Sequence, residues 1–251
     1  MKKANKKVNA AIIIIGNEIL SGRTQDVNVV SISEWLNELG VKLEEVRIIP
    51  DVEYVIVKTI HDVRKKFDYI FTTGGIGPTH DDITSKSISK TFNLNYGKHP
   101  EAYKLLEKYY GTDNFNKGRK KMAMLPTKAK LILNPSSMAP GFNVENVYCL
   151  PGVPSILKSM LGGLTNKIIG GKKILSKTIN LRTVESEIAK SLEKVQNKYN
   201  KIEIGSYPFF KKGKIGVSIV IRSTEEKLIL ACYKDIERFI KKKRIRIIKK
   251  G

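Results

Sequence analysis

Short apolar runs alternate with stretches of helical period along the first hundred residues of this chain. Residues 8–15 fit a strand buried on both faces, residues 41–49 predict a second strand, and the apolar run at 69–71 predicts a third. Apolar residues recur at helical spacing over residues 29–39 and 52–66, and another helix is predicted to open near Ile83. Strands and helices alternating at these intervals predict an α/β domain with a mostly parallel sheet and helices on both faces.

The pattern changes character after about residue 170. Before that point we expect a helix over 100–110, strands over 129–133 and 147–150, and a helix reaching Met160. Gly162-Gly163 and Gly170-Gly171 are expected to flank a domain boundary. Beyond it we expect a strand over 173–182, a helix capped by Thr183 and ending near 198, a hairpin of 202–210 with 214–222, a helix over 225–242 and a last strand within 244–248. The prediction is therefore one domain over residues 1–170 and a small α+β domain over residues 171–251.

Polar loops follow the predicted parallel strands. They span Gly16–Asn28, Pro50-Asp51 and Thr73–Asp82. Because the carboxyl ends of parallel strands lie on one side of a sheet, ligands bind there and these loops should converge on one rim. A second Gly/Pro turn, PGVP at 151–154, also follows a strand and could add backbone donors to the same rim.

The stretch FTTGGIGPTHDDIT, residues 71–84, carries the strongest chemical signal. Its glycines let a ligand approach the backbone closely, and a strand-to-helix turn offers N–H groups to a phosphate. Two carboxylates beside a phosphate are reasonable if a divalent cation lies between them. The alternative is that Asp81 or Asp82 merely caps the following helix.

Composition narrows the possibilities less than these motifs do. The net charge of +22 could indicate nucleic acid, an anionic membrane or phosphorylated ligands, but the lysines are spread along the chain, with concentrations only at its two ends. No apolar stretch approaches 18 residues and the basic start lacks a signal-peptide pattern, so we expect a cytoplasmic protein without a membrane span. Cys149 and Cys232 are expected to be buried free thiols.

Four stretches together resemble the molybdopterin-binding (MoaB/Mog) domain family, most closely the N-terminal region of CinA-type competence/damage-inducible proteins. They are GNEILSGRTQDVN, TGGIGPTHDDIT, NPSSMAPGF and PGVP, and they cover about the first two-thirds of the chain. The resemblance implies a three-layer α/β/α fold. The part from about residue 171 resembles the small KH-like domain of the CinA type. A C-terminal deamidase domain would have no room here, so we expect no nicotinamide-nucleotide deamidation.

The resemblance also implies site residues. Asp51 and Asp82 match the acidic pair that acts with magnesium, and Asp81, Asp82 and Glu18 are the expected divalent-metal ligands, with a monovalent cation as a further candidate. The expected phosphate- and ligand-binding residues are Gly74, Gly75, Gly77, Thr79, Ser21, Asn28 and Gly152. The ligand would be molybdopterin or a nucleotide diphosphate such as ADP-ribose, and relatives of this type are usually dimers or trimers.

Two functions follow from the resemblance, and two departures bear on the choice. One function is metal-dependent ADP-ribose pyrophosphohydrolysis; the other is a non-catalytic module for molybdopterin. Asn17 replaces the family's aspartate, and Ile156 with Leu157 replaces an acidic residue after PGVPS. His80 is either a metal ligand or acid, or a solvent-facing turn residue. Nucleic-acid binding through the C-terminal part and its basic end, 241–251, ranks last, because we expect no GXXG loop between its helices.

Overall fold

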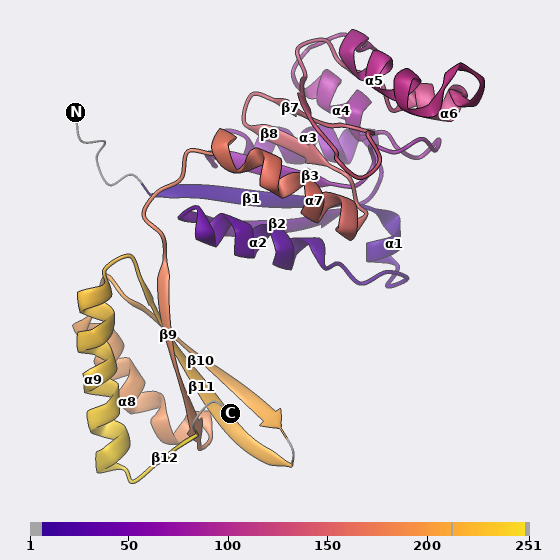
Figure 1. Cartoon of the computed structure of the whole chain (residues 1–251). Coiled ribbons are helices and arrows are strands. Elements are labelled where there is room, and N and C mark those ends of the chain that lie inside the picture. Colours follow the sequence, from indigo (N-terminus) through magenta and orange to yellow (C-terminus); the bar gives the residue numbers. More distant parts are fainter. Residues whose placement is uncertain (1–6, 212, 249–251) are drawn as a thin grey trace, which may run out of the picture. The chain divides into compact units, whose positions relative to one another are not determined.

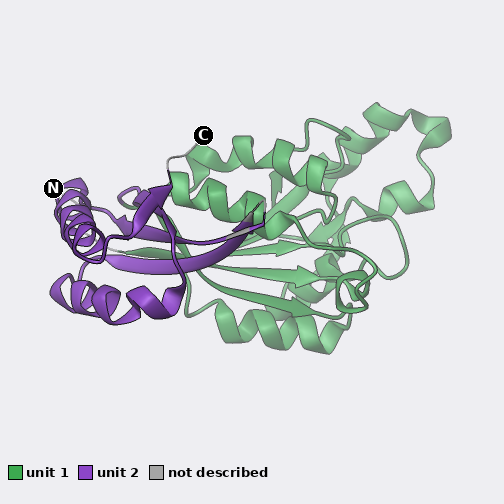
Figure 2. Ribbon diagram, turned by 90° about the horizontal axis from the view of Figure 1, so that it is seen from below, with its two compact units in different colours: residues 1–171 green, residues 172–251 purple. Residues whose placement is uncertain are grey.

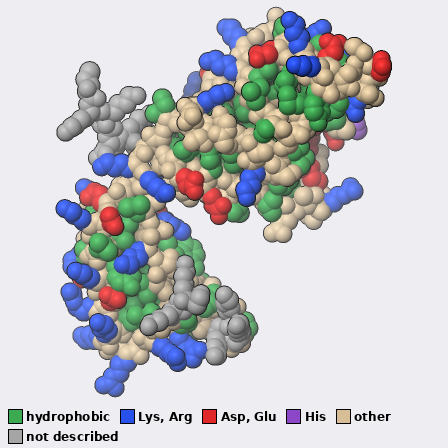
Figure 3. Space-filling model, viewed as in Figure 1, with side chains coloured by type: hydrophobic (Ala, Val, Ile, Leu, Met, Phe, Trp, Pro, Cys, Tyr) green, Lys and Arg blue, Asp and Glu red, His purple; other side chains and the backbone are tan. Residues whose placement is uncertain are grey.

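The chain divides into two compact units, residues 1–171 and residues 172–251, shown in separate colours in Figure 2. The computed structural model describes residues 7–211 and 213–248. Of the two glycine pairs expected to flank the boundary, Gly170-Gly171 ends the first unit, whereas Gly162-Gly163 lies before it, inside helix α7 (Pro154–Leu164). Lys and Arg side chains are spread over both units on the face drawn in Figure 3.

The first unit is built on a six-stranded sheet in the order β2-β1-β3-β8-β7-β6 (Figure 1). β1 (Val8–Ile15), β2 (Val41–Ile49), β3 (Tyr69–Thr73) and β8 (Val147–Leu150) run parallel, as the apolar runs predicted. β7 (Gly141–Val144) and β6 (Lys130–Ile132) complete one edge in antiparallel register. The expected α/β class with a mostly parallel sheet is therefore confirmed.

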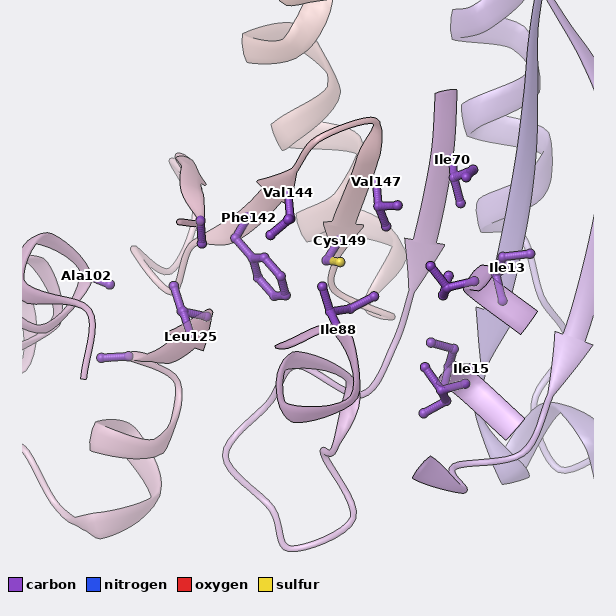
Figure 4. Packing of buried hydrophobic residues seen from close by; sticks show 14 of the residues in the cluster. Ile13, Ile15, Ile70, Ile88, Ala102, Leu125, Phe142, Val144, Val147 and Cys149 are labelled. Atoms are coloured by element: carbon purple, nitrogen blue, oxygen red, sulfur yellow. The ribbon is translucent and has the colours of Figure 1, made fainter. Parts of the chain in front are cut away.

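Helices cover both faces of this sheet and give three layers (Figure 2). α2 (Asn28–Glu38) and α7 pack on one face, and α3 (Glu53–Val63) and α4 (Thr84–Thr91) pack on the other. β1, β3 and β8 are largely buried because both faces of the sheet are covered, whereas the edge strand β2 alternates with exposed residues. Figure 4 shows the packing on the α3–α4 side, where Ile88 of α4 lies near Phe142 and Cys149 of the sheet.

An excursion of the chain between α4 and β6 extends this second layer. Its elements are β4 (Tyr96–Lys98), α5 (Pro100–Tyr110), the 3-10 turn η1 (Thr112–Asn114), α6 (Lys117–Lys121) and β5 (Met124–Pro126). β4 and β5 pair with each other in a separate two-stranded sheet. Leu106, Phe115 and Leu125 from the excursion join the core formed with α3 and α4. The excursion is thus a packed part of the first unit. The remaining helical elements described in this unit are α1 (Asn17–Leu20) and the 3-10 turn η2 (Thr165–Lys167).

Helix α4 is held by unusually small side chains. Ser87, Ser89 and Thr91 are buried, and each hydroxyl donates to the carbonyl four residues earlier, at 2.9–3.0 Å. These bonds satisfy the hydroxyls inside the helix itself, so α4 can lie closely against its neighbours without unpaired polar groups. Because α4 follows the glycine-rich turn directly, this packing fixes the turn's position.

The second unit is a small α+β domain, as expected. β9 (Leu175–Arg182), β10 (Glu203–Lys211), β11 (Lys214–Ser223) and β12 (Arg246–Ile248) form an antiparallel sheet in the order β10-β11-β9-β12. α8 (Glu185–Lys198) and α9 (Glu226–Lys242) supply the helical part of its core. The helix cap proposed for Thr183 is wrong: Val184 occupies the cap position and no side chain bonds there.

β10 and its hairpin with β11 have three local features. Pro208 lies in the middle of β10, which is an edge strand of its sheet. A Cβ on Gly205 would lie 2.6 Å from the Tyr207 ring, so that ring covers the glycine. The sequence GKIG, residues 213–216, does lie between α8 and α9, contrary to our expectation that no GXXG occurs there; it forms the end of the β10–β11 hairpin and does not join two helices.

The two cysteines lie in the cores of the two units. Cys149 and Cys232 are free and buried, as predicted. Burial raises the pKa of Cys149 to about 12 and that of Cys232 to about 11. Among the helices of the described residues, none has the length and apolar character needed to cross a membrane. Residues 249–251 of the basic end and Lys212 of the hairpin lie outside the described residues.

Candidate functional site

The loops after the parallel strands meet at one rim of the first sheet. The N–H of Gly16, after β1, donates to the carbonyl of Ile49 at the end of β2 (3.1 Å). The N–H of Gly74, after β3, donates to Leu150 at the end of β8 (3.1 Å). The side-chain amide of Asn28 donates to the Gly152 carbonyl at 2.8 Å. Four segments distant in sequence are therefore bonded together where parallel topology places them.

Glycine is required at two positions of the turn between β3 and α4. Gly74 has φ +97° and Gly75 has φ +68°, a region that residues with a Cβ rarely adopt. A Cβ on Gly74 would lie 2.1 Å from the Ile15 carbonyl oxygen, and one on Gly75 would lie 2.1 Å from the Thr84 hydroxyl. The turn is thus pressed against β1 on one side and the start of α4 on the other.

The same turn presents a row of unbonded backbone donors. Within the described residues, the N–H groups of Gly75, Ile76 and Gly77 donate no hydrogen bond to a protein acceptor, and all three residues are partly exposed. The next amide with a partner is that of Thr79. Successive N–H groups of this kind form a concave site for an anion.

Asp82 is turned inward and holds the turn closed. Its carboxylate accepts hydrogen bonds from the Thr79 N–H (2.7 Å) and the Thr79 hydroxyl (2.5 Å). A Cβ on Gly77 would lie 2.8 Å from the same carboxylate oxygen. Neither Asp81 nor Asp82 caps α4, because Ile83 occupies the N-cap position and no side chain makes a capping hydrogen bond.

The pKa of Asp51, at the rim, is raised above its usual value. Burial raises its pKa, and the negative charges of Glu18 and Asp81 act in the same direction. A hydrogen bond from the Asn17 N–H, 2.8 Å from the Asp51 carboxylate, partly offsets this. The exposed Asp81 differs: hydrogen bonding to the Thr79 side chain is the main reason that its pKa is lowered.

Of the expected metal ligands, Glu18 and Asp81 act on the pKa of Asp51, but the three do not form a preassembled cage. Glu18 folds back, so that a Cβ on Gly16 would lie 2.5 Å from its carboxylate. Among the described residues, no group of three or more His, Cys, Asp or Glu side chains is placed to hold a metal ion. Asp82 in particular is occupied by Thr79.

A small cavity of about 60 Å³ opens at the rim beside these groups. Its walls include Glu18, Asn28, Gly74 and Gly152 of the expected site. Asn28 is 4% exposed, and its carbonyl oxygen Oδ1 is buried without a partner among the described residues. An unpaired buried acceptor is costly, so this atom is a natural contact for a donor group on a ligand.

Thr24, Gln25 and Asp26 also line the cavity, and sequence reasoning did not include them among the site residues. The signal was their position, between Ser21 and Asn28 in the same polar loop. Ser21 itself is exposed, and its hydroxyl donates to the Glu18 carbonyl (3.2 Å). His80 is a fully exposed turn residue, with Asp81 at 4.0 Å.

Comparison with known proteins agrees with this architecture. Residues 11–170 match the family described as "Probable molybdopterin binding domain", and residues 173–248 match the family described as "FAD synthase, middle domain". A protein of Archaeoglobus fulgidus is 30% identical over 93% of this chain and 98% of its own length. A competence-damage inducible protein of Pediococcus pentosaceus is 31% identical over 80% of this chain, which spans 51% of that relative.

A solved structure extends the similarity to three dimensions. The crystal structure of the protein CinA with unknown function from Thermoplasma acidophilum is 30% identical in sequence, with a TM-score of 0.61. The similarity covers 64% of this chain and 98% of that one. The family match spans more than half of the chain and includes every loop of the rim. The chain belongs to the molybdopterin-binding (MoaB/Mog) domain family and is a CinA-type member of it.

Proposed function

We propose that the first unit binds a phosphorylated pterin or a nucleotide diphosphate at the turn between β3 and α4. The observation that carries this proposal is the row of three unbonded N–H groups at Gly75, Ile76 and Gly77. A phosphate oxygen accepts hydrogen bonds from such donors, and the glycines leave room for close approach. Asp82 contributes by bonding to Thr79 and so keeping the turn in this shape.

Asn28 supports the same location for the ligand. Its amide nitrogen is fixed by the Gly152 carbonyl, which directs Oδ1 to one place at the rim. A hydroxyl or N–H group of the ligand would satisfy that oxygen. Sugars and pterins both carry such donors, so Asn28 favours the ligand class without separating its members.

The carboxylates of the rim fit a divalent cation that arrives with the ligand. Glu18 and Asp81 both raise the pKa of Asp51, and a cation would relieve this repulsion. Because the described residues contain no group of three such side chains placed to hold a metal, we assign Asp51 and Glu18, not Asp82, to contact the cation, with phosphate oxygens of the bound molecule and water as its other ligands. When bound, a divalent cation neutralises charge on a diphosphate and makes its phosphorus atoms easier to attack.

We further propose hydrolysis of the diphosphate, with ADP-ribose as the substrate to test. Water adds its oxygen to one phosphorus, the bridging P–O bond breaks, and AMP and ribose 5-phosphate leave as dianions with two protons released above the second phosphate pKa of about 6. Held beside the cation, the Asp51 carboxylate would accept a hydrogen bond from the attacking water and so orient it.

The test is chromatography of ADP-ribose incubated with the protein and a panel of divalent metals. Wild type should release AMP and ribose 5-phosphate, Asp51→Asn should release neither, and Asp51→Asn should still be stabilised against heat by ADP-ribose. Failure of wild type to form product, with stabilisation by ligand retained, would reject hydrolysis and leave the second candidate, a non-catalytic binding module. The engagement of Asp82 with Thr79 favours that second candidate.

A further inference from the structure

A second and much larger hollow lies on the other side of the same turn. Its volume is about 610 Å³, within the range of ligand pockets, whereas the 60 Å³ cavity at the rim is too small for a heterocyclic ring. Pro78 and His80 of the turn form one wall, and the excursion between α4 and β6 forms the rest. The turn therefore has a small acidic cavity at its beginning and a large hollow at its end.

The chemistry of the hollow is cationic with an aromatic lining. Lys98, Lys117, Lys120 and Lys121 line it, and no Asp or Glu is found among its described lining residues. Tyr96 and Tyr103 contribute rings, and the Lys98 ammonium lies 3.5 Å from the centre of the Tyr103 ring. Lysines around apolar and aromatic surface suit a planar heterocycle that carries an anionic group.

The hollow is bonded to the turn. The Lys121 ammonium donates to the Thr79 carbonyl, within the turn that Asp82 closes. At Gly118 a Cβ would lie 3.4 Å from the Pro78 side chain, so α6 rests directly on the turn. Lys117 and Lys120, on the same helix, are exposed and make no ion pair with any residue that the structure describes. The Lys120 ammonium lies 5.6 Å from the centre of the Phe115 ring, and no carboxylate of the described residues neutralises either lysine, so both charges attract an anionic ligand.

From these observations we infer that the hollow formed by Pro78, Tyr96, Lys98, Tyr103, Lys117 and Lys120 binds the ring-bearing end of a phosphorylated heteroaromatic ligand. The ring lies against the tyrosines, and Lys117 with Lys120 contacts its phosphate. The inference rests on the proposed function, since the turn then holds the remaining phosphate between the two cavities. A nucleotide and a phosphorylated pterin share this chemistry.

The test compares Lys117→Gln/Lys120→Gln with a matched control, Lys104→Gln/Lys108→Gln. The control lysines are exposed on α5 and do not line the hollow, and replacing them removes the same amount of charge. Calorimetric titrations use AMP, neopterin phosphate, ribose 5-phosphate and inorganic phosphate. We expect the hollow variant to lose about tenfold or more in affinity for the heteroaromatic ligand that binds wild type, and the control to lose about twofold or less, because a direct charged contact is worth more than a distant charge.

The four probes separate the ligand sources and the failure modes. Tighter binding of AMP than of neopterin phosphate identifies a nucleotide site, and the reverse identifies a pterin site. Equal affinity for ribose 5-phosphate and AMP in wild type, or equal losses in the two double variants, overturns the inference about the hollow. Those results leave the proposed function standing if Asp51→Asn still abolishes hydrolysis of ADP-ribose. If wild type does not hydrolyse ADP-ribose but binds AMP in a way that depends on Lys117 and Lys120, only the proposed reaction is rejected.

Discussion

The backbone N–H of Asn17 donates a 2.8 Å hydrogen bond to the carboxylate of Asp51, joining the start of α1 to the end of β2. Because the donor belongs to the backbone, any non-proline residue at position 17 can keep the bond. The departure from the family's aspartate at this position therefore changes the charge beside Asp51 without removing its hydrogen bond.

Replacing Asn17 with aspartate should consequently strengthen binding of a divalent cation. The added carboxylate would raise the pKa of Asp51 further in the metal-free protein, in the same direction as Glu18 does. A cation would relieve this repulsion, and about 1 kcal/mol, or fivefold in affinity, is a reasonable gain for one more partly exposed charge. Titration with Mn²⁺ measures it, with Asn17→Ser as control. Equal affinity in Asn17→Asp and wild type would argue against a cation near Asp51.

Gly75→Ala should damage both stability and ligand binding. Its positive φ costs about 1 kcal/mol for alanine, and the new methyl group would collide with the Thr84 hydroxyl. Gly22→Ala is the control, since Gly22 also has a positive φ (+72°) but open space around its Cβ position. We expect Gly75→Ala to be at least about 1 kcal/mol less stable than Gly22→Ala in urea unfolding. Similar stabilities would mean that the turn can move away from α4.

Gly162→Ala should stabilise the protein. Gly162 lies in α7, is exposed and has no heavy atom within 4 Å of its Cβ position. Alanine in a helix interior is favoured over glycine by about 0.5–1 kcal/mol. A rise in the thermal midpoint is the expected result, and Gly163→Ala, in the same kind of environment, should give a similar rise. A fall for both would indicate that this part of α7 is not helical in solution.

Asp235→Asn should weaken the second unit in a pH-dependent way. The Asp235 carboxylate accepts bonds from Lys198 (2.6 Å), Tyr199 (2.9 Å) and Arg238 (2.9 Å), and the bond from Lys198 is the main reason that its pKa is lowered. A lowered carboxyl pKa stabilises the folded state above the unfolded pKa, and this stability is lost as the pH falls through the folded value.

We expect the Asp235→Asn difference from wild type to be about 1 kcal/mol at pH 7, since its partners are largely exposed, and to shrink toward zero near pH 2. Urea unfolding of the full chain, followed at several pH values by a probe in the second unit, measures it. Glu193→Gln, at an exposed position on α8, is the control and should be neutral throughout. A difference that persists unchanged at pH 2 would assign the effect to packing.

The sequence was sufficient to predict the sheet and the meeting of its loops, for a physical reason. Runs such as residues 8–15 can be buried on both faces only in a covered parallel sheet, and parallel strands place their carboxyl ends together. Asp82 is different. A carboxylate at this position can face a metal or its own turn, and only the local geometry, with Thr79 at 2.7 Å, decides between them.

The cationic hollow was beyond sequence reasoning for a related reason. In the sequence, Lys117 and Lys120 are two of many dispersed lysines, because nothing in their spacing predicts that they lie beside Pro78. Their proximity depends on how an excursion of about thirty residues folds back on α4, which involves contacts between residues far apart in the chain. Thr24 and Gln25 escaped notice similarly, since a polar loop does not disclose which of its side chains turn toward the rim.

The proline in the middle of β10 has a consequence for how copies of this protein can meet. An exposed edge strand invites strand addition from a neighbouring chain, but Pro208 offers no N–H for a continuing ladder and its ring obstructs one. Edge-to-edge self-association through β10 is therefore disfavoured, and so is the aggregation that begins in that way. A dimer that continued the sheet of the second unit would therefore have to pair through its other edge strand, β12, and not through β10.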